Sequence, residues 1–326
     1  MDRKKALACI VSAAAMFCLI MDGKTALHGA NDGIDICIRT VIPSLFPFLF
    51  FSILLDQALG GHPLGFLGPL SKIIGYPRGH GHLMISSLIG GYPIGAQAVA
   101  NAYREGSIDK ATAEKMLAYS NNAGPAFIFG MLGQMFPDPK VPWLLWGIHI
   151  LSAMMIGIIM SPRILSSHDP RAKRKSSPQT MSRAVKVTGI VCGWVILFRI
   201  FITFLESYFL QRSSPELKVI CMGLLELTNG CCGLSSIEDP RIRSIICSGL
   251  IALGGSCVTM QTISVTQGLS IRYYLLGKAA QCILSLIICG SLVFRIWTVP
   301  LVLVAAMIAW HIKHKNNCGN PIAIRV

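Results

Sequence analysis

Charged side chains are scarce in this sequence, and their scarcity argues against a soluble domain. Only 13% of the 326 residues are Asp, Glu, Lys or Arg, whereas 53% are hydrophobic. A typical soluble domain carries about 25% charged residues. The composition therefore predicts a multi-pass protein of the cell membrane whose surroundings are the lipid bilayer. We expect an all-α fold, because a helix satisfies its own backbone inside lipid.

Acidic residues are the scarcer of the two charged classes. The chain has 15 Asp and Glu against 29 Lys and Arg, which gives a net charge of +14. Such an excess could indicate a nucleic-acid partner, but the basic residues lie mainly between the apolar runs. That distribution is typical of cytoplasmic loops. We therefore expect no nucleic-acid partner.

The motifs of metal and catalytic sites are missing. None of the 12 cysteines forms a CxxC pair, and most lie in apolar runs, where Cys behaves as a small hydrophobe. His80 and His82 have no further ligand at a metal-binding spacing. The sequence has no P-loop, no G-x-S-x-G, no G-x-G-x-x-G ahead of a helix and no paired carboxylates. We expect no metal, no cofactor and no enzymatic activity.

Uncharged runs mark the places where the chain can cross the membrane. A crossing helix needs about 20 residues. The candidate spans cover 6–21, 40–55, 79–103, 116–137, 141–162, 187–205, 217–237, 244–271, 273–294 and 296–312. The first span follows a basic start, as in a signal peptide. No small-residue cleavage site follows it, so we expect an uncleaved span.

The densest basic segment divides the chain into two halves. Residues 163–186 contain seven Lys or Arg and one acidic residue, which predicts a cytoplasmic linker. An N-terminal transmembrane half, 1–162, precedes it, and a C-terminal transmembrane half, 187–326, follows it.

The two halves share a short pattern that suggests an internal repeat. Residues 90–97 read GGYPIGAQ and residues 254–261 read GGSCVTMQ, each inside an apolar run. Transporters are commonly built from two such repeats, with the binding site where interrupted helices meet near the membrane midplane. We therefore expect two internal repeats with broken or re-entrant helical hairpins. Whether 79–103 and 244–271 turn back or cross fully is open.

The first glycine-rich segment is a candidate binding element. An unpaired backbone group costs several kcal/mol inside hydrocarbon, so a break there must face protein or a water-filled cavity. A helix that begins near Ile94 would aim its free N–H groups at that cavity. The alternative is close packing of helices through small residues, with an amide bonding across the interface. The candidate binding residues are Gly90, Gly91, Tyr92, Gly95, Gln97 and Asn101, of which the last two share a helix face.

A second polar break follows in the same half. Asn121 and Asn122 precede Gly124-Pro125, and proline disfavours helix just before it. Freed carbonyls and Asn side chains could coordinate a cation or a polar ligand, whereas the alternative is a simple turn at the membrane surface. Upstream, Pro43 and Pro47 predict a kinked span in which Ser44 offers its hydroxyl.

The second half places a carboxylate in an apolar stretch. Glu226 and Asn229 lie in LLELTNGCCGL, residues 224–234. A charged side chain in a span costs about 2.5–3.5 kcal/mol on insertion scales, and it usually marks an ion path or a proton relay. We expect Glu226 to bind a coupling cation, a proton or sodium. The alternative is a structural pair with Lys278 or Arg199.

The remaining candidates belong to the second glycine pair and the helix after it. Gly254, Gly255 and Gln261 are expected to line the second break, and Asn229 to contribute an amide. Lys278 shares a helix face with Gln281. It could attract an anionic substrate, or it could extend its amino group towards the membrane surface.

Several of these motifs together resemble a known family. They are PSLFPF (43–48), GGYPIGA (90–96), REGSIDKATAEKMLAYSNNAGPAFIFG (104–130), ELTNG (226–230), GGSCVTMQ (254–261) and YLLGK (274–278). In order and spacing they resemble the YlbJ-type sporulation integral membrane proteins of the nucleoside-recognition, or Gate, domain family. Two departures are Ser-Cys-Val at 256–258 in place of Leu-Ser-Val, and Gly124 in place of Ser or Ala.

The resemblance implies a relation to concentrative nucleoside transporters, whose hairpins and broken helices surround the substrate. It also implies transport of dipicolinic acid during endospore formation, in the outer forespore membrane of a sporulating cell. From the residues we expect a transporter of a small polar or anionic metabolite that works by alternating access. The alternatives are a nucleoside or other solute carrier and a non-transporting scaffold of spore assembly. The oligomeric state is open.

Overall fold

The structure is a computed structural model, and it describes residues 3–59, 68–77, 79–160 and 180–317. Within these ranges every regular element is a helix, which confirms the predicted all-α class. The first half contains α1 (Arg3–Met21), α2 (Gly23–Ile36), the π-helix η1 (Cys37–Val41), α3 (Ile42–Leu59), α4 (Gly68–Ile74), α5 (Gly81–Ile89), α6 (Ile94–Arg104), α7 (Lys110–Ser120), the π-helix η2 (Ala126–Met131), the 3₁₀-helix η3 (Leu132–Met135) and α8 (Lys140–Met160).

The second half contains α9 (Thr180–Tyr208), α10 (Pro215–Leu225), α11 (Leu227–Cys232), the 3₁₀-helix η4 (Gly233–Ser236), α12 (Pro240–Leu253), α13 (Gly255–Val265), α14 (Arg272–Val293) and α15 (Thr298–Asn317). Residues 180–186 of the predicted linker therefore belong to α9, and residues 161–179 lie outside the described part.

Five helical segments are long and apolar enough to cross a membrane: Gly23–Leu55, Lys140–Met160, Thr180–Tyr208, Pro240–Val265 and Arg272–Val293. Shorter apolar helices cover Lys5–Met21 and Thr298–Ala309, where the sequence predicts the first and last spans. Large hydrophobic side chains stay exposed on the outer surface, among them Ile20, Phe51 and Leu301. Lipid would cover these side chains, because in a membrane they need no protein partner.

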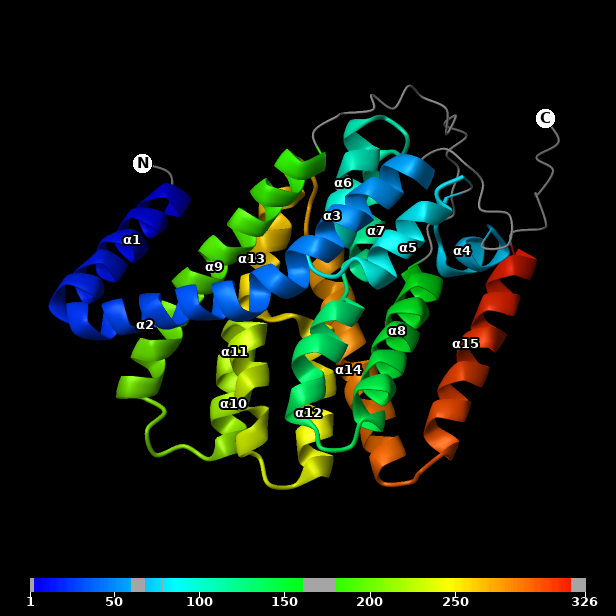
Figure 1. Ribbon diagram of the computed structural model, residues 1–326. Helices are drawn as coiled ribbons and strands as arrows, with labels where there is room; N and C mark the ends of the chain where they lie inside the picture. The colour runs from blue at the N-terminus through cyan, green and yellow to red at the C-terminus, as the bar shows by residue number, and fades with distance from the viewer. Residues whose placement is uncertain (1–2, 60–67, 78, 161–179, 318–326) are drawn as a thin grey trace.

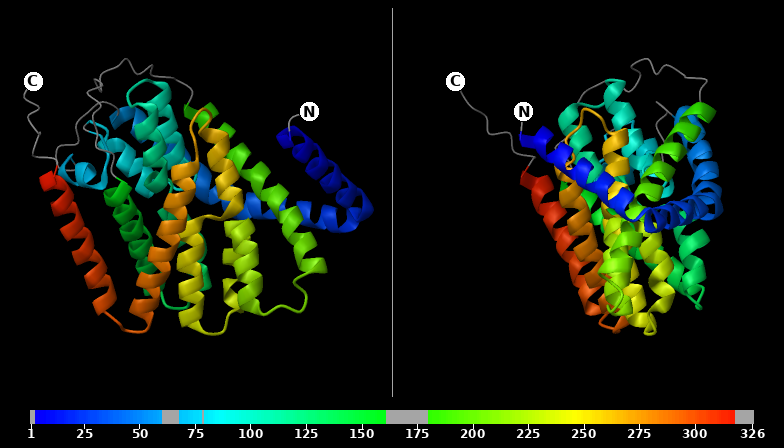
Figure 2. Two further views of the ribbon diagram at one scale, coloured as in Figure 1. Left: turned by 180° about the vertical axis from the view of Figure 1, so that it is seen from behind. Right: turned by 90° about the vertical axis from the view of Figure 1, so that its left-hand side faces the viewer.

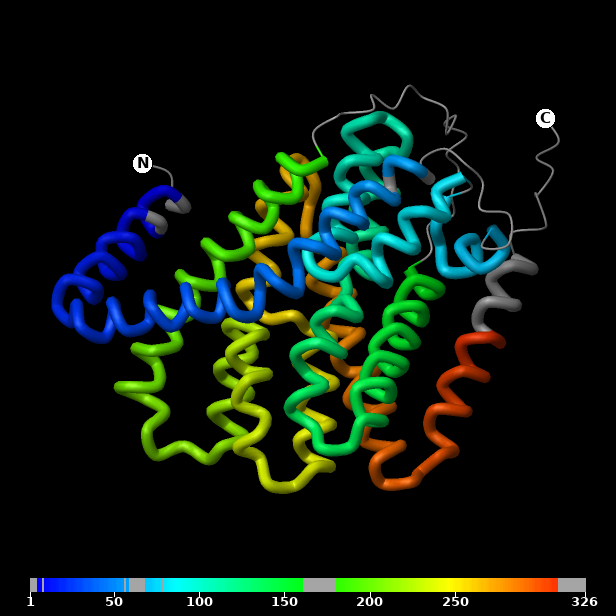
Figure 3. Tube along the Cα trace, viewed as in Figure 1, coloured from blue at the N-terminus to red at the C-terminus, as the bar shows by residue number. Residues whose placement is uncertain are grey.

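The helices give the molecule two distinct ends. The loops that join η3 to α8, α9 to α10, η4 to α12 and α14 to α15 lie along the lower edge in Figure 1. The α6–α7 and α13–α14 loops and the start of α9 lie at the upper edge, which we call the linker end (Figures 1 and 2). α2, η1 and α3 form one long bent rod that runs across the outside of the bundle (Figure 3).

The first glycine-rich segment is the tip of a helical hairpin. α5 ends at Ile89, α6 begins at Ile94, and the two helices pack against each other. A Cβ added to Gly95 would lie 3.0 Å from the Cα of Ser87. Since these two residues are equally far in sequence from Gly91, the helices run antiparallel. The predicted span 79–103 therefore turns back, and its helix begins at Ile94 as predicted.

A second hairpin has its tip at Glu226. α10 and α11 meet at this single residue and pack against each other. A Cβ added to Gly230 would lie 2.3 Å from the Cα of Gly223, and the two glycines flank Glu226 almost symmetrically. The predicted membrane span 217–237 is therefore wrong. It is two short antiparallel helices, because one extended residue reverses the chain there.

The second glycine pair interrupts a crossing segment instead. Gly254 and Gly255 have φ angles of +80° and +75°, a left-handed conformation that favours glycine. α12 and α13 lie on either side of the interruption and form the single candidate span Pro240–Val265. GGYPIGAQ and GGSCVTMQ therefore have different local structures, because one is a hairpin tip and the other a break within one long apolar helical segment.

An order of elements nevertheless recurs along the chain. A hairpin (α5–α6), a broken helix (α7–η2) and a long helix (α8) occur in the first half. A hairpin (α10–α11), a broken helix (α12–α13) and a long helix (α14) occur in the second. The two internal repeats stay a prediction. This order of elements pairs the hairpin α5–α6 with the hairpin α10–α11, whereas the sequence pattern paired residues 90–97 with residues 254–261.

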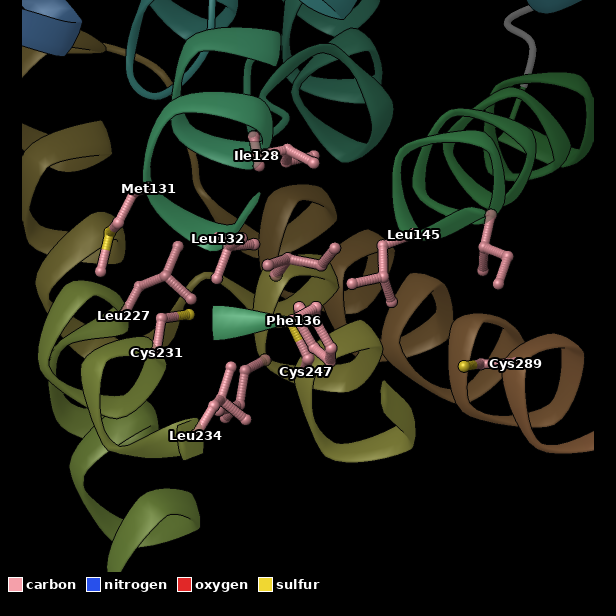
Figure 4. Close-up of a cluster of buried hydrophobic side chains, with 14 of the residues drawn as sticks. Ile128, Met131, Leu132, Phe136, Leu145, Leu227, Cys231, Leu234, Cys247 and Cys289 are labelled. Carbon is pink, nitrogen blue, oxygen red and sulfur yellow. The ribbon is translucent and has the colours of Figure 1, made fainter. Parts of the chain in front are cut away.

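The two halves pack into one body. α2 packs on α9, while α7 and α8 both pack on α14. Figure 4 shows a buried cluster in which Ile128 and Leu145 of the first half meet Leu227 and Cys247 of the second. This shared core joins the two halves through buried hydrophobic contacts.

Candidate functional site

The backbone breaks converge on one pocket in the interior. Its walls come from η1 and α3, the first hairpin tip, the break after α7, the middle of α9, the second hairpin tip and α13. The lining residues are Thr40, Val41, Ser44, Leu45, Phe48, Gly90, Gly91, Tyr92, Gly124, Ala126, Phe127, Val191, Val195, Glu226, Leu227, Thr228, Val258 and Gln261. We call this the central pocket. Its volume is about 80 Å³.

Close backbone contact at the first tip explains the glycines. Gly91 has a φ of +81°, and a Cβ added to Gly124 would lie 2.9 Å from the Gly91 Cα. The hairpin tip therefore presses directly on the break that follows α7. A side chain at Gly124, where the resembled family commonly has Ser or Ala, would force these two backbones apart.

Tyr92 connects the first hairpin tip to the second half of the chain. Its hydroxyl donates to the carbonyl of Ile251 at 2.8 Å, just before the break between α12 and α13. A Cβ added to Gly254 would come within 3.4 Å of the tyrosine hydroxyl. Gly254 thus leaves room for the aromatic ring of a residue 162 positions earlier, and Tyr92 joins two of the interrupted segments.

Glu226 is buried in the wall of the central pocket and caps α11. Its side chain is 2% exposed. Its carboxylate accepts hydrogen bonds from the backbone N–H of Thr228 at 3.0 Å, the backbone N–H of Asn229 at 2.7 Å and the side-chain amide of Asn229 at 2.6 Å. These donors occupy both carboxylate oxygens, and the two backbone N–H groups are ones that the start of α11 would otherwise leave unpaired.

Glu226 forms an ion pair with neither Arg199 nor Lys278, so the predicted structural pair is wrong. Arg199 instead binds Asp32 at 2.8 Å and Glu206 at 3.0 Å, which ties α9 to α2. Lys278 has no ion pair with a carboxylate among the described residues. Glu226 is therefore held by a helix N-terminus and an amide.

Lys278 is buried beside the first hairpin tip. Its residue is 2% exposed, so the amino group does not extend to the membrane surface, and the snorkelling alternative is wrong. It donates to Gln281 Oε1 at 2.7 Å, to Asn122 Oδ1 at 3.3 Å and more weakly to the Tyr92 hydroxyl at 3.5 Å. It also lies 5.2 Å from the centre of the Tyr92 ring. Its described partners are all neutral.

The two asparagines after α7 lie in the interior, so the surface-turn alternative is wrong. Both side chains are fully buried. Asn121 donates to the Thr262 hydroxyl at 2.8 Å, which links this break to α13. Asn122 donates to the carbonyls of Ser87 and Tyr119 and accepts from Lys278. These residues hold the breaks together, and they also present polar atoms inside the bundle.

Sequence reasoning missed His149. This α8 residue is 1% exposed, and its Nε2 accepts from the backbone N–H of Ala123 at 2.9 Å. That bond satisfies a donor freed by the break after α7. Gln281 donates to the His149 carbonyl at 3.2 Å and connects it to Lys278. The available signal was a single imidazole in an apolar run, with Ser152 three residues later on the same face.

Two predicted residues line a different pocket. Gln97 and Asn101 are half-buried and face a larger cavity between α6, α9 and α13. They therefore do not contact the central pocket. The two residues share one face of α6 nearer the linker end, and their role in binding stays a prediction.

Of the other predicted residues, some line the central pocket and some allow close packing of the helices around it. Ser44 and Gln261 line the central pocket, although the Ser44 hydroxyl donates to the Thr40 carbonyl at 2.6 Å. Gly95 packs against the Ser120 carbonyl, and Gly255 packs against the Gly223 carbonyl. These two glycines permit close helix contact and do not line the central pocket.

Outside the spans, Asp109 caps the N-terminus of α7. It accepts from the Thr112 backbone N–H at 2.9 Å and from the Thr112 hydroxyl at 2.6 Å. Burial raises the pKa of this carboxyl, but these hydrogen bonds outweigh it and hold the pKa below its ordinary value. The cap fixes the α6–α7 turn at the linker end.

Comparison with known proteins adds one relative. The sporulation integral membrane protein YlbJ of Bacillus subtilis (strain 168) is 22% identical over 304 residues, covering 78% of this chain and 74% of the relative. The chain is similar to a YlbJ-type sporulation integral membrane protein. This confirms the predicted resemblance to YlbJ-type proteins and, with the five long apolar helices, an integral membrane protein.

Two further comparisons give no match. No family model matches the sequence, so the relation to the nucleoside-recognition domain stays a prediction. No solved structure matches either. The similarity to YlbJ therefore supports the kind of protein, while the site rests on the geometry above.

Proposed function

We propose that this chain is a membrane transporter of a small polar or anionic metabolite that works by alternating access. The observation that supports it is the meeting of two hairpin tips and a broken helix around one pocket, inside a bundle of membrane-crossing helices. Interrupted backbone at membrane depth is tolerated where it is buried in protein or lines a water-filled cavity. Transporter binding sites are typically formed by such discontinuous helices.

Lys278 favours an anionic solute. A buried charge without a counter-charge is costly, and the described partners of this amino group are neutral oxygens. Lys278 is not among the residues that line the central pocket, but Tyr92 lines that pocket and contacts the Lys278 amino group. In the proposed cycle, movement of the first hairpin tip brings the carboxylate of the solute to this amino group. The N-terminus of α6 begins at the same tip, and helix N-termini also favour anions.

The small size of the central pocket is consistent with alternating access, in which the site opens to admit the solute. Its volume of about 80 Å³ is far below the roughly 300–1,000 Å³ of ordinary small-molecule sites. An aromatic dicarboxylate therefore requires the two hairpin tips to separate. In the proposed cycle the two short hairpins move relative to the long helices.

The similarity to YlbJ suggests which solute to test first. That relative is a sporulation protein, so we propose dipicolinic acid, carried across the outer forespore membrane of a sporulating cell. A nucleoside or another solute is the alternative cargo, and a non-transporting scaffold of spore assembly is the alternative role. The three make different predictions in a reconstituted membrane.

The test is uptake by proteoliposomes that contain the full chain. We expect uptake of dipicolinate, and at least a tenfold reduction in the Lys278→Met variant, because the counter-charge is removed while the side-chain length is kept. Lys140→Met is the matched control, since Lys140 is exposed at the opposite end of the molecule. Uridine is the comparison solute.

Each outcome separates the proposals. Uptake of uridine but not of dipicolinate would replace the anion by a nucleoside. Absence of uptake for both, with a folded protein in the vesicles, would favour the scaffold. Equal dipicolinate uptake in Lys278→Met and wild type would remove the role assigned to the buried lysine.

A further inference from the structure

A second, larger cavity lies beside the central pocket, nearer the linker end. It lies between α6, α9 and α13, and its volume is about 670 Å³. Its lining residues are Gln97, Asn101, Arg104, Arg183, Lys186, Val187, Ile190, Gly193, Trp194, Leu197, Ser264, Val265 and Gln267. We call it the vestibule.

The vestibule and the central pocket share two walls. On α9, Val191 and Val195 line the central pocket, while Ile190 and Trp194 line the vestibule. On α13, Gln261 lines the central pocket, and the next turn lines the vestibule. The two spaces therefore lie next to each other along the same pair of helices.

The charge of the vestibule has one sign. Arg104, Arg183 and Lys186 line it, and no Asp or Glu is among its described lining residues. Within the described part of the chain, none of these three cations forms an ion pair with a carboxylate. Such a positive recess concentrates anions from solution, because low-dielectric walls focus the field into the opening.

Arg104 is fixed in place at one wall. Its Nε donates to the Ala100 carbonyl at 3.2 Å, and one terminal nitrogen donates to the Val265 carbonyl at 3.1 Å. The guanidinium therefore spans from α6 to α13. Its remaining donors are available to a ligand, since an arginine has five in total.

Neutral donors continue the path inward from the cations. Gln97, Asn101 and Arg104 are spaced by four and three residues, so they form one stripe along α6. On the facing wall, the indole N–H of Trp194 donates to the Ser264 hydroxyl at 3.1 Å, which fixes the ring at the cavity. A flat organic anion would meet charge first, then amide groups and an aromatic surface.

We propose that the vestibule binds a small organic carboxylate on its way between the linker end and the central pocket. The passage of the solute to the central pocket rests on the proposed transport function. The binding of an anion in the vestibule does not depend on transport. Under this proposal, Gln97 and Asn101 contact the solute in the vestibule, before it reaches the hairpin tips. The sequence had placed these two residues at the substrate site.

Trp194 provides a probe of local potential that needs no knowledge of the substrate. A single-tryptophan protein is made by replacing Trp143, Trp146, Trp297 and Trp310 with Phe. Quenching of the remaining fluorescence is measured with iodide, an anion, and with acrylamide, which is neutral. We expect iodide to quench more strongly than acrylamide at low salt, and the difference to disappear in about 1 M salt, where the screening length is about 3 Å.

Charge-removing variants locate the effect. One variant combines Arg104→Gln, Arg183→Gln and Lys186→Gln. Its quenching constant for iodide should fall about threefold for each kT of local potential that is lost, while its quenching constant for acrylamide should not change. The matched control is Lys110→Gln/Lys115→Gln/Arg272→Gln, which removes the same charge from the linker end but outside the vestibule lining. Unchanged acrylamide quenching also shows that the variant is folded, and Lys186→Gln alone is the milder substitute if it is not.

Competition and uptake complete the test. Dipicolinate should protect Trp194 from iodide, while uridine should not. In vesicles the vestibule variant should raise the KM for dipicolinate about tenfold at low salt and leave kcat nearly unchanged, because it acts before the central pocket. Iodide quenching equal in the vestibule and control variants would overturn the inference. A charge effect on Trp194 without any uptake would keep the vestibule and reject the transporter.

Discussion

At the residue scale, Glu226 and Lys278 are both buried, and each is satisfied without the other. Glu226 is bound by two backbone N–H groups and an amide, whereas Lys278 donates to neutral oxygens. Glu226 lines the central pocket, so a cation that entered there would meet its carboxylate. These two environments are the basis for proposing a coupling cation at Glu226 and an anionic solute near Lys278.

Replacing Glu226 by Gln separates its two roles. The neutral amide keeps one acceptor oxygen and loses the charge, so the α11 cap should weaken by about 0.5–2 kcal/mol. If the carboxylate binds a coupling proton or sodium, uptake by the variant should also lose its dependence on pH or on sodium. Glu238→Gln, in the exposed turn before α12, is the control. A lowered melting temperature with unchanged pH and cation dependence would leave only the cap.

Sequence reasoning at this scale succeeded where chemistry alone forces the answer. A carboxylate or a lysine that faces lipid has a large free-energy cost, so such a residue in an apolar run is expected in the interior. Glu226 and Lys278 could therefore be identified from the sequence as interior residues. His149 could not, because its partner is the backbone N–H of Ala123, and that group is free only as a result of the break. The contact of Tyr92 with Ile251 joins residues 159 positions apart, which no local pattern encodes.

At the element scale, glycines decide how closely the hairpins can approach the broken helices. A Cβ on Gly95 would lie 1.6 Å from the Ser120 carbonyl oxygen, and real structures do not tolerate such a distance. The contact holds α6 against the end of α7. It therefore keeps the first tip next to the break at Asn121 and Asn122.

We expect Gly95→Ala to unfold or misassemble the first hairpin. The added methyl group must displace backbone, which cannot move as a flexible side chain can, so little folded protein should be recovered from membranes. Gly147→Ala is the matched control, because Gly147 is in α8 with no atom within 4 Å of its added Cβ. Alanine there should be neutral or stabilising by up to about 1 kcal/mol. Equal thermal stability of both variants in detergent would show that the tight contact at Gly95 is not formed.

Hydrophobic runs predicted the existence of the helical elements better than their direction. The runs near 141–162, 187–205 and 273–294 became long helices, because a continuous apolar stretch of this length has one favourable arrangement in lipid. The runs 79–103 and 217–237 also contain apolar stretches, yet both reverse. Reversal depends on contacts such as that between Gly223 and Gly230, and hydropathy does not register contacts within a run.

At the scale of the whole molecule, the two halves act as one body. Arg199 of α9 bridges to Asp32 of α2, and Asn121 of the first half donates to Thr262 of the second. Lys278 extends the same polar contacts to Asn122. Each half therefore completes hydrogen bonds that the other half leaves open, in addition to sharing a hydrophobic core.

This arrangement predicts that the chain can be cut between its halves without falling apart. A protease site placed between residues 163 and 179 leaves α8 and α9 whole, so cleavage in detergent removes no described contact between the halves. The two fragments should co-elute in size-exclusion chromatography and keep the melting temperature of the intact protein within a few degrees. The control is the same cleaved chain with Arg199→Met and Asn121→Ala, which removes polar contacts between the halves and should separate at a lower temperature. If the cleaved wild-type fragments elute apart, covalent connection rather than packing holds the hairpin tips together, and the central pocket would not survive the cut.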